Sequence, residues 1–251
     1  MSAGVTLRAG AASPPVHVLK FGSSVLGGPE GYRGVAEEVG REVARGRKVV
    51  AVVSAMGETT DRLLAAARAV TSTPPNALVG ALLATGEEAS VALLTIALGD
   101  VGVAATGFTR ARLPVRTRGA LADASPVAVD TGRITSTLEY YDAVVFPGFV
   151  GVDVTGAPSL LGRGGSDLTA LFLGRAVGAA EVRLVKDVDG IFPADPVQGR
   201  GLRPFRRLSW AHARDIGGGV VQEKALGYAE RNGIRFRVAG MGGRGTWVGA
   251  A

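Results

Sequence analysis

The sequence predicts an α/β protein built on a mostly parallel sheet that helices cover on both faces. Two observations predict this class. Short apolar runs alternate along the chain with longer segments at helical period, and several runs are continuously apolar, as in KVVAVV at 48–53. Such runs are typical of strands buried on both sides of a parallel sheet. With 47% hydrophobic and 20% charged residues, the 251-residue chain can bury a sizeable core, and we expect one large domain.

The expected elements follow one another as strand, loop and helix. The expected strands are 16–19, 48–53, 101–106, 141–146, 182–185 and 235–238, the last of which closes the pattern. The expected helices are 32–45, 62–70, 77–98, a helix after the Gly-rich turn within 160–177, and 220–231. Ser166 or Asp167 is the expected N-cap of the fourth of these helices.

The composition excludes several classes of site. There is no cysteine, which excludes disulfides, thiolate nucleophiles and Cys-based metal sites and fits a reducing, cytoplasmic location. The two histidines are His17, in an expected core strand, and His212, near an expected helix start. They argue against a Ser-His-Asp triad and a His-based metal site, so no metal-binding residue is predicted.

Charge and apolar patterns argue against nucleic acid and membranes as partners. The net charge is +6, but the arginines that supply most of it are scattered and form no basic stripe. The longest apolar stretches, such as 49–55 and 90–98, are shorter than the roughly 18 to 20 residues that span a membrane. Residues 1–15 lack the apolar segment of a signal peptide, and we expect a disordered leader there.

The first candidate anion site is the loop after the first expected strand. Lys20 stands at the end of that strand, and Gly22, Ser23 and Ser24 follow it at an expected helix start. Backbone N–H groups there could hold phosphate oxygens, and the ammonium could neutralise charge that develops during phosphoryl transfer. A solvated lysine before an ordinary turn is the alternative.

A second Gly-rich loop, RGGSD at 163–167, repeats this design at another expected helix start. Gly164 and Gly165 permit close approach of the backbone to a ligand, and Arg163 can bind a carboxylate through two parallel hydrogen bonds. Asp167 can orient the lysine or a metal. The alternative is a capping turn without a ligand.

Six motifs resemble the catalytic domain of aspartokinases in the amino acid kinase superfamily, in the family's order over about residues 16–249. They are KFGSS (20–24), VVSAMGETTD (52–61), TGE (85–87), GFVG (148–151), GRGGSD (162–167) and KDVDGIFPADP (186–196). The resemblance implies a three-layer αβα sandwich, with a substrate lobe at about 16–158 and a nucleotide lobe at about 159–249. It also implies transfer of the γ-phosphoryl group of ATP, used with Mg²⁺, to the side chain of L-aspartate, giving 4-phospho-L-aspartate.

The resemblance assigns roles to the matching residues. Lys20 would bridge the phosphates in the transition state, and Asp167 would organise that lysine. Glu87 would face the α-ammonium of the substrate and Arg163 a carboxylate, with a helix-surface acid as the alternative for Glu87. The expected substrate contacts are Ser54, Thr60, Glu87, Arg163 and Ser166. The expected nucleotide contacts are Lys20, Phe21, Gly22, Ser23, Gly164, Gly165, Lys186, Asp187, Phe192 and Lys224.

Departures from the family pattern leave alternatives open. Phe192 replaces a tyrosine, Val197 replaces an arginine, and Gly219 stands where the family has a phosphate-contacting lysine. Lys186, which replaces a threonine, and Lys224 are the candidate substitutes for the missing cations. A non-catalytic nucleotide- or amino-acid-binding domain is therefore an alternative, with a downstream dehydrogenase as its partner. A more anionic acceptor is another, suggested by arginines at 110, 112, 116 and 118, although a solvated basic loop accounts for these better.

The resemblance also bears on assembly and control. The expected ligands are an acidic amino acid and ATP, and the expected assembly is a homodimer. Aspartokinases that respond to lysine, threonine or methionine carry regulatory domains after the kinase domain, and only five residues follow Gly245 and Thr246 here. We therefore expect no regulatory domain and no feedback inhibition by these amino acids.

Overall fold

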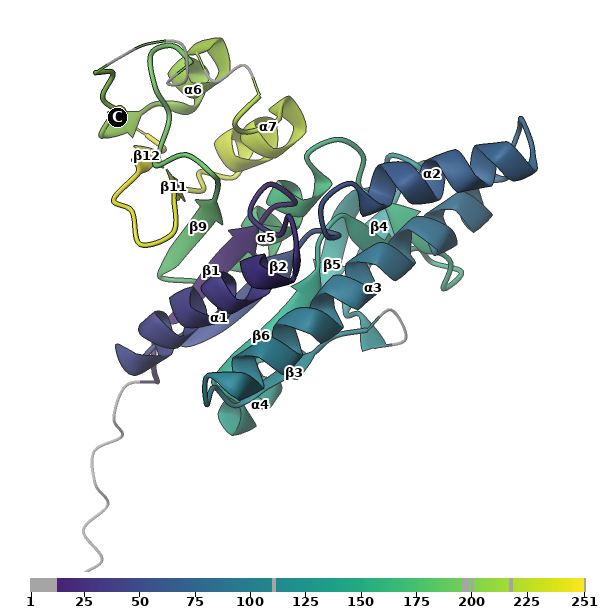
Figure 1. Cartoon of the computed structure of the whole chain (residues 1–251), viewed down its shortest axis with the longest axis horizontal. Coiled ribbons are helices and arrows are strands. Elements are labelled where there is room, and N and C mark those ends of the chain that lie inside the picture. The colour runs from purple at the N-terminus through teal and green to yellow at the C-terminus, as the bar shows by residue number, and fades with distance from the viewer. Residues whose placement is uncertain (1–12, 110–111, 196–198, 200, 217–218, 251) are drawn as a thin grey trace, which may run out of the picture.

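The structure is a computed structural model that describes residues 13–109, 112–195, 199, 201–216 and 219–250. An eight-stranded sheet with the order β10-β12-β11-β9-β1-β2-β6-β3 forms its centre (Figure 1). Its strands are β1 (Val16–Phe21), β2 (Lys48–Val53), β3 (Ala105–Gly107), β6 (Ala143–Pro147), β9 (Glu181–Val185), β10 (Arg207–Leu208), β11 (Phe236–Ala239) and β12 (Thr246–Val248). Neighbouring strands are parallel except β11 with β12, which confirms the predicted mostly parallel sheet.

Alternate side chains of the central strands enter two hydrophobic cores, one on each face of the sheet. On one face Leu19 and Phe21 pack with α1 (Pro29–Ala44) and α3 (Asn76–Asp100). On the other face Val18 belongs to a core that includes residues of α4, α5, α6 and α7. These helices are α4 (Thr131–Tyr140), α5 (Gly165–Ala176), α6 (Trp210–Ile216) and α7 (Glu223–Arg231). The period-2 alternation of strand side chains thus produces three layers, as expected for the αβα sandwich.

A smaller four-stranded sheet lies beside the main one and was not predicted. Its order is β5-β4-β7-β8, and its strands are β4 (Val115–Arg118), β5 (Ser125–Val129), β7 (Val150–Val152) and β8 (Pro158–Leu160). These strands are short, and a sequence pattern of three to five residues is weak evidence for any element. The expected lobe boundary at 158/159 falls inside β8, which pairs with β7.

Both Gly-rich loops differ in detail from the sequence prediction. Helix α1 begins at Pro29 with Gly28 as its N-cap, so Gly22 and Ser23 lie in a turn that precedes the helix by several residues. The N-cap of α5 is Gly164, with φ of 77°, in the left-handed region that glycine adopts at little cost. The prediction of Ser166 or Asp167 as the N-cap is therefore wrong, because both lie within the first turn of α5.

Other boundaries also shift. The expected strand 101–106 is reduced to β3, because Gly102, with φ of 76°, lies in a turn after α3. The strand that was expected to close the pattern, now β11, is followed by β12. Helix α2 (Thr59–Val70), which packs against α3, begins three residues earlier than expected. The expected leader at 1–15 lies mostly outside the described residues, which begin at Ser13.

Helix α3 is longer and more apolar than the stretches 49–55 and 90–98 suggested. By length and composition alone it could cross a membrane, and it is the one helix of this kind in the described part of the chain. In the fold it packs against α1, α2, β6 and β8, and 44% of its apolar window is buried. Its residues Leu83, Leu94 and Leu98 belong to the protein core, which is a sufficient reason for its apolar character.

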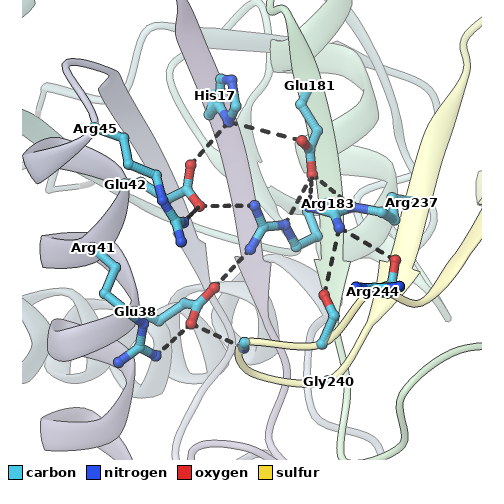
Figure 2. A network of polar contacts seen from close by, with 12 residues as sticks. His17, Glu38, Arg41, Glu42, Arg45, Glu181, Arg183, Arg237, Gly240 and Arg244 are labelled. Atoms are coloured by element: carbon cyan, nitrogen blue, oxygen red, sulfur yellow. Dashed lines mark hydrogen bonds and ion pairs between the residues drawn. The ribbon is translucent and has the colours of Figure 1, made fainter.

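A buried ionic network ties the first half of the chain to the second (Figure 2). Arg183 of β9 donates to Glu38 Oε1 at 2.6 Å and to Glu42 Oε1 at 3.0 Å, both on α1. It also donates to Glu181, which in turn accepts from Arg237 of β11 at 2.8 Å. Glu42 Oε2 lies 3.2 Å from Nδ1 of His17, which is buried in β1 as predicted. These contacts fix α1 relative to the strands that lead to the site.

Candidate active site

Three loops meet at the carboxyl edge of the main sheet. Strands β1, β2 and β9 are parallel neighbours in register, with Lys20 beside Val52 of β2 and Leu184 of β9. Lys20 near the end of β1, Ser54 after β2 and Lys186 after β9 therefore reach the same edge. Helix α5 packs on β1 and β9, and its first turn carries Asp167 to this edge.

Asp167 holds two lysines, one on each carboxylate oxygen. Lys20 Nζ lies 2.8 Å from Oδ1, and Lys186 Nζ lies 2.9 Å from Oδ2. Burial raises the pKa of Asp167, but the two ammonium groups outweigh this effect and the net pKa lies below its ordinary value. Burial and repulsion from Lys20 lower the pKa of Lys186, against the opposing attraction of Asp167. Two cations and one carboxylate leave this cluster with an excess of one positive charge.

A cavity of about 330 Å³ opens beside this cluster. Ser54 and Ser166 are hydrogen-bonded across it through their hydroxyls at 3.1 Å. Glu87 of α3 lines it and is only 3% exposed, and its Oε2 has no hydrogen-bond partner among the described residues. Burial raises the pKa of Glu87 to about 8, although a bond from the Ala55 backbone and the charge of Lys20 partly offset the rise. Such an unpartnered buried acid is arranged to receive a cation.

Arg163 lies exposed beside the same cavity, in the loop before α5. No carboxylate pairs with it in the described part of the chain. The cavity therefore presents an acid at its buried side and an unpaired guanidinium at its exposed side, which suits a ligand that carries both an ammonium and a carboxylate.

A larger cavity, of about 630 Å³, adjoins the first. Lys186, Asp187 and Phe192 line it, together with apolar side chains that include Ile191 and Ile216. Lys186, Gly219 and Val220 line both cavities and so form their common wall. The two cavities therefore adjoin at Lys186, one of the two lysines that Asp167 holds.

A family model, that of the amino acid kinase family, matches residues 15–240. The chain belongs to the amino acid kinase family. The match spans both cavities and all the strands of the main sheet except β12. It confirms the superfamily that the six motifs indicated and the fold class that the alternating pattern predicted.

Among amino acid kinases, several aspartokinases are similar to this chain in sequence. That of Thermus thermophilus is 35% identical over 224 residues, or 88% of this chain and 55% of the relative. That of Mycobacterium tuberculosis is 37% identical over 225 residues, or 88% of this chain and 53% of the relative. The crystal structure of aspartate kinase from Synechocystis superposes with a TM-score of 0.80 at 28% identity, covering 94% of this chain and 40% of that one. The chain thus spans about half the length of these relatives.

The structure brings most of the predicted site residues together. The smaller cavity is lined by Lys20, Ser23, Ser54, Thr60, Glu87, Arg163, Gly164, Gly165, Ser166, Asp167 and Lys186. The larger cavity is lined by Lys186, Asp187 and Phe192. Glu87 is buried within the fold, so the alternative of a helix-surface acid is wrong.

Three predicted nucleotide contacts lie elsewhere. The side chain of Phe21 is fully buried in the core beneath α1, and Phe21 lines neither cavity. Gly22 lies beside the site without lining either cavity, and a Cβ there would come within 3.0 Å of Lys20 Nζ, so glycine leaves room for that ammonium. Lys224 donates to Asp123 Oδ1 at 2.5 Å and to the carbonyls of Ala124 and Leu161, which uses all three of its donors. It joins α7 to residues that flank β5 and β8, and it lines neither cavity.

The structure describes some of the residues that depart from the family pattern and not others. Gly219 lies in the common wall with φ of 151° and contributes no side chain. Val197 and Arg110 lie outside the described residues. Arg112, Arg116 and Arg118 are exposed, as expected of a solvated basic segment, but Arg116 and Arg118 belong to strand β4 and not to a loop.

Sequence reasoning missed several lining residues. Val220 and Gln222 line the smaller cavity, and Asp61 joins them from the start of α2. Asp61 ends the motif at 52–61, so its place in that motif was an available signal. Val220 follows a run of three glycines, and an apolar residue after such a run is an ordinary feature of turns, which gives no signal for a ligand.

Proposed function

We propose that this chain is an aspartate kinase that transfers the γ-phosphoryl group of ATP to the side-chain carboxylate of L-aspartate. The observation that carries the proposal is the junction of the two cavities at Lys20, Asp167 and Lys186. The larger cavity would hold the nucleotide, and the smaller one the amino acid. Similarity to aspartokinases over 88% of the chain supports the choice of acceptor.

The amino acid would be held at both ends. Glu87, as its carboxylate, would bind the α-ammonium, and Arg163 would bind the α-carboxylate through two parallel hydrogen bonds. Ser54, Thr60 and Ser166 supply hydroxyls along the cavity between them. This leaves the side-chain carboxylate of aspartate to face the lysine cluster, where its charge and that of the phosphates are attracted.

The reaction would need position and charge more than proton transfer. A carboxylate oxygen of aspartate forms a bond to the γ-phosphorus, the bond from that phosphorus to the β–γ bridging oxygen breaks, and ADP leaves with the electron pair. No proton changes hands in this step. Lys20 would neutralise the charge on the transferring group, and Asp167 would hold Lys20 in place at 2.8 Å.

Mg²⁺ belongs to the proposal as the ion that accompanies ATP. The described residues contain no group of three or more acidic, histidine or cysteine side chains that could hold a metal. Mg²⁺ commonly keeps several waters and takes its remaining ligands from phosphates and one or two carboxylates. Asp187 and Asp195 line the larger cavity and are the carboxylates placed to contact such an ion, which would shield the phosphate charge during transfer.

Cytoplasmic location, a role in amino-acid biosynthesis and a homodimeric assembly are further parts of the proposal. Their support is the resemblance to aspartokinases, together with a composition that contains no cysteine. A downstream dehydrogenase partner would follow only if the chain proves to bind its ligands without catalysis.

Trapping the product with hydroxylamine tests the proposal directly. The purified chain is incubated with ATP, Mg²⁺, hydroxylamine and either L-aspartate, L-glutamate or N-acetyl-L-glutamate. We expect a hydroxamate with aspartate, and a Lys20→Ala variant should form it at least about 100-fold more slowly, since one preorganised cation is lost. Lys48→Ala is the matched control, because Lys48 pairs with Asp142 at the opposite end of β2. Hydroxamate with another acid alone would reassign the acceptor, and none with any would contradict catalysis.

A further inference from the structure

We propose that Lys186 is a second catalytic lysine, which contacts the transferring phosphoryl group together with Lys20. The inference rests on the proposed function, because it concerns the same phosphoryl transfer. It starts from an observation that the role of Lys20 does not explain. One buried carboxylate holds two buried ammonium groups, at 2.8 Å and 2.9 Å, where one would suffice to neutralise it.

The position of Lys186 separates it from Lys20. Lys20 lines the smaller cavity, whereas Lys186 lines both. Of the three residues in the common wall, Gly219 and Val220 carry no charge, so Lys186 is the one cation of that wall within the described chain. A phosphoryl group transferred from a nucleotide in one cavity to a carboxylate in the other moves across the boundary that these three residues border. Lys186 therefore supplies the ammonium that lies next to the phosphoryl group in both cavities.

The charge of the cluster also requires an anion. The side chains of Lys20 and Lys186 are 8% and 14% exposed, and that of Asp167 is 5% exposed. A buried cation without a matching anion is costly, and the excess charge here is not balanced by Glu87, which is largely protonated at neutral pH. Asp187 is a further acid beside Lys186, and Mg²⁺ bound with ATP would engage it. The three oxygens of a transferring phosphoryl group supply the anion that the cluster lacks.

Rigid elements hold Lys186 in this position. It follows β9, the direct neighbour of β1 in the sheet, and its backbone N–H donates to the carbonyl of Ala239 at the end of β11 at 2.9 Å. Its side chain is then fixed by Asp167 in the first turn of α5. Both lysines are thus preorganised by the same carboxylate, so neither has to be ordered when the substrates bind.

A purely structural role makes a different prediction. If Lys186 only neutralised Asp167, a Lys186→Met variant would leave the neutral pair of Lys20 and Asp167, and turnover would stay near that of the wild type. If Lys186 contacts the transferring group, the variant loses transition-state stabilisation while ADP still binds in the larger cavity.

The test compares binding of ADP with binding of ADP plus aluminium fluoride, a mimic of the transferring phosphoryl group, in the presence of Mg²⁺. In Lys186→Met we expect the affinity for the mimic to fall by about 100-fold or more and that for ADP by less than about tenfold. Equal losses for both would overturn the inference and place Lys186 on the nucleotide alone, and no loss for either would overturn it as well. Lys48→Met, remote from the site, is the matched control and should bind both as the wild type does.

Turnover provides a second readout, with folding checked by circular dichroism. Lys186→Met should lower kcat about 100-fold or more with a smaller change in the KM for ATP, and Lys186→Arg should recover part of this loss because it keeps the charge. A kcat within about threefold of the wild type in Lys186→Met would overturn the inference. If the methionine variant unfolds, the ratio of mimic affinity to ADP affinity is compared between Lys186→Arg and the wild type, and an unchanged ratio would overturn the inference.

The binding assay needs no acceptor, so the two proposals can fail separately. The inference can fail while hydroxamate forms, and the proposed function can fail while the mimic binds through Lys186.

Discussion

Glu87 should make aspartate binding depend on pH. Its pKa of about 8 lies above the ordinary value of 4.5, so at neutral pH the empty site holds the acid form, which must lose its proton to pair with an ammonium. We expect the KM for aspartate to fall as pH rises from 6 to 8, by up to about tenfold per unit, and to level off above 8. Initial rates across this range measure it.

The matched variant is Glu87→Gln, which should bind aspartate weakly and with a KM that does not change with pH.

The raised pKa of Glu87 also affects the stability of the fold. A raised pKa means that the buried carboxyl opposes folding above about pH 4.5, where the unfolded chain is ionised, and the effect grows until the folded group ionises near pH 8. Glu87→Gln should therefore gain melting temperature relative to the wild type between pH 5 and 8. A KM for aspartate that is flat across that range would contradict the assignment.

Arg163 should discriminate between the two proposed substrates, aspartate and ATP. Lysine cannot reproduce two parallel N–H donors, so Arg163→Lys should weaken aspartate binding by about tenfold or more and leave ATP binding nearly unchanged. Calorimetric titration of each ligand separately measures the two affinities. Arg175→Lys, on the far end of α5, serves as the control. Equal losses for both ligands would place Arg163 on the phosphates.

The candidate site could be predicted largely because its chemistry lies in contiguous loops. Lys20, Arg163 and Asp167 stand within two residues of glycines in loops that follow expected strands, where glycine allows close approach of the backbone to a ligand. Lys224 shows where this reasoning fails, since a lysine near a Gly-rich turn has the same sequence whether its ammonium faces a phosphate or, as here, the Asp123 carboxylate. Tertiary contacts that decide such cases are formed by residues far away in the sequence.

At the level of elements, Gly148 controls how the start of α5 meets the end of β6. A Cβ at this position would lie 2.6 Å from Cβ and Oγ of Ser166 and 3.0 Å from the carbonyl oxygen of Val53. We therefore expect Gly148→Ala to displace Ser166 and raise the KM for aspartate several-fold, with a loss of stability of about 1–3 kcal/mol. Steady-state kinetics and denaturant titration measure the two effects.

Gly99 offers the matched control for this substitution. It lies in the last turn of α3, and a Cβ there meets nothing within 4 Å. Gly99→Ala should leave the KM unchanged and stabilise the fold by about 0.5–1 kcal/mol, because alanine favours the helix. If both alanine variants behaved alike, the close approach at Gly148 would not matter for the site.

The sequence predicted best the elements that have one clear hydrophobic pattern. Strand β2 has the predicted bounds, 48–53, because its continuous apolar run lies between charged and polar residues. The strands of the small sheet were missed because they are only three to five residues long, and of the four only Val115–Arg118 alternates buried and exposed residues strictly. Their pairing partners lie elsewhere in the chain, and the pairing is what makes them strands.

At the scale of the whole molecule, the network around Arg183 should dominate the response to charge removal. Arg183→Met leaves Glu38 and Glu42 buried without their shared partner, which typically costs about 3–5 kcal/mol. Urea titration at pH 7 measures this loss. Arg41→Met is the control, because Arg41 pairs with Glu38 from an exposed position and should cost less than about 1 kcal/mol.

The difference in stability between the wild type and Arg183→Met should narrow in acid. Burial raises the pKa of Glu42, but hydrogen bonds from His17, Arg47 and Arg183 outweigh it and hold the pKa well below 4.5. Stability from a lowered pKa is present above the unfolded value and is lost as pH falls below it. Wild-type stability should therefore decline below about pH 4.5 more steeply than that of Arg183→Met. Parallel declines would show that Glu42 does not depend on Arg183.

The division of the interior into two cores has a consequence for the order in which the protein assembles. The described core beneath α1 and α3 draws its buried residues from Leu19 to Val103, with Ala143, Val145 and Val185 as later additions, whereas the opposite core extends from Val18 to Val248. A chain emerging from the ribosome can thus begin to bury its first layer before half of it has been made. The pair of lysines on Asp167 forms only after β9 has joined β1. The first core can therefore begin to form before the cluster of Lys20, Asp167 and Lys186 exists.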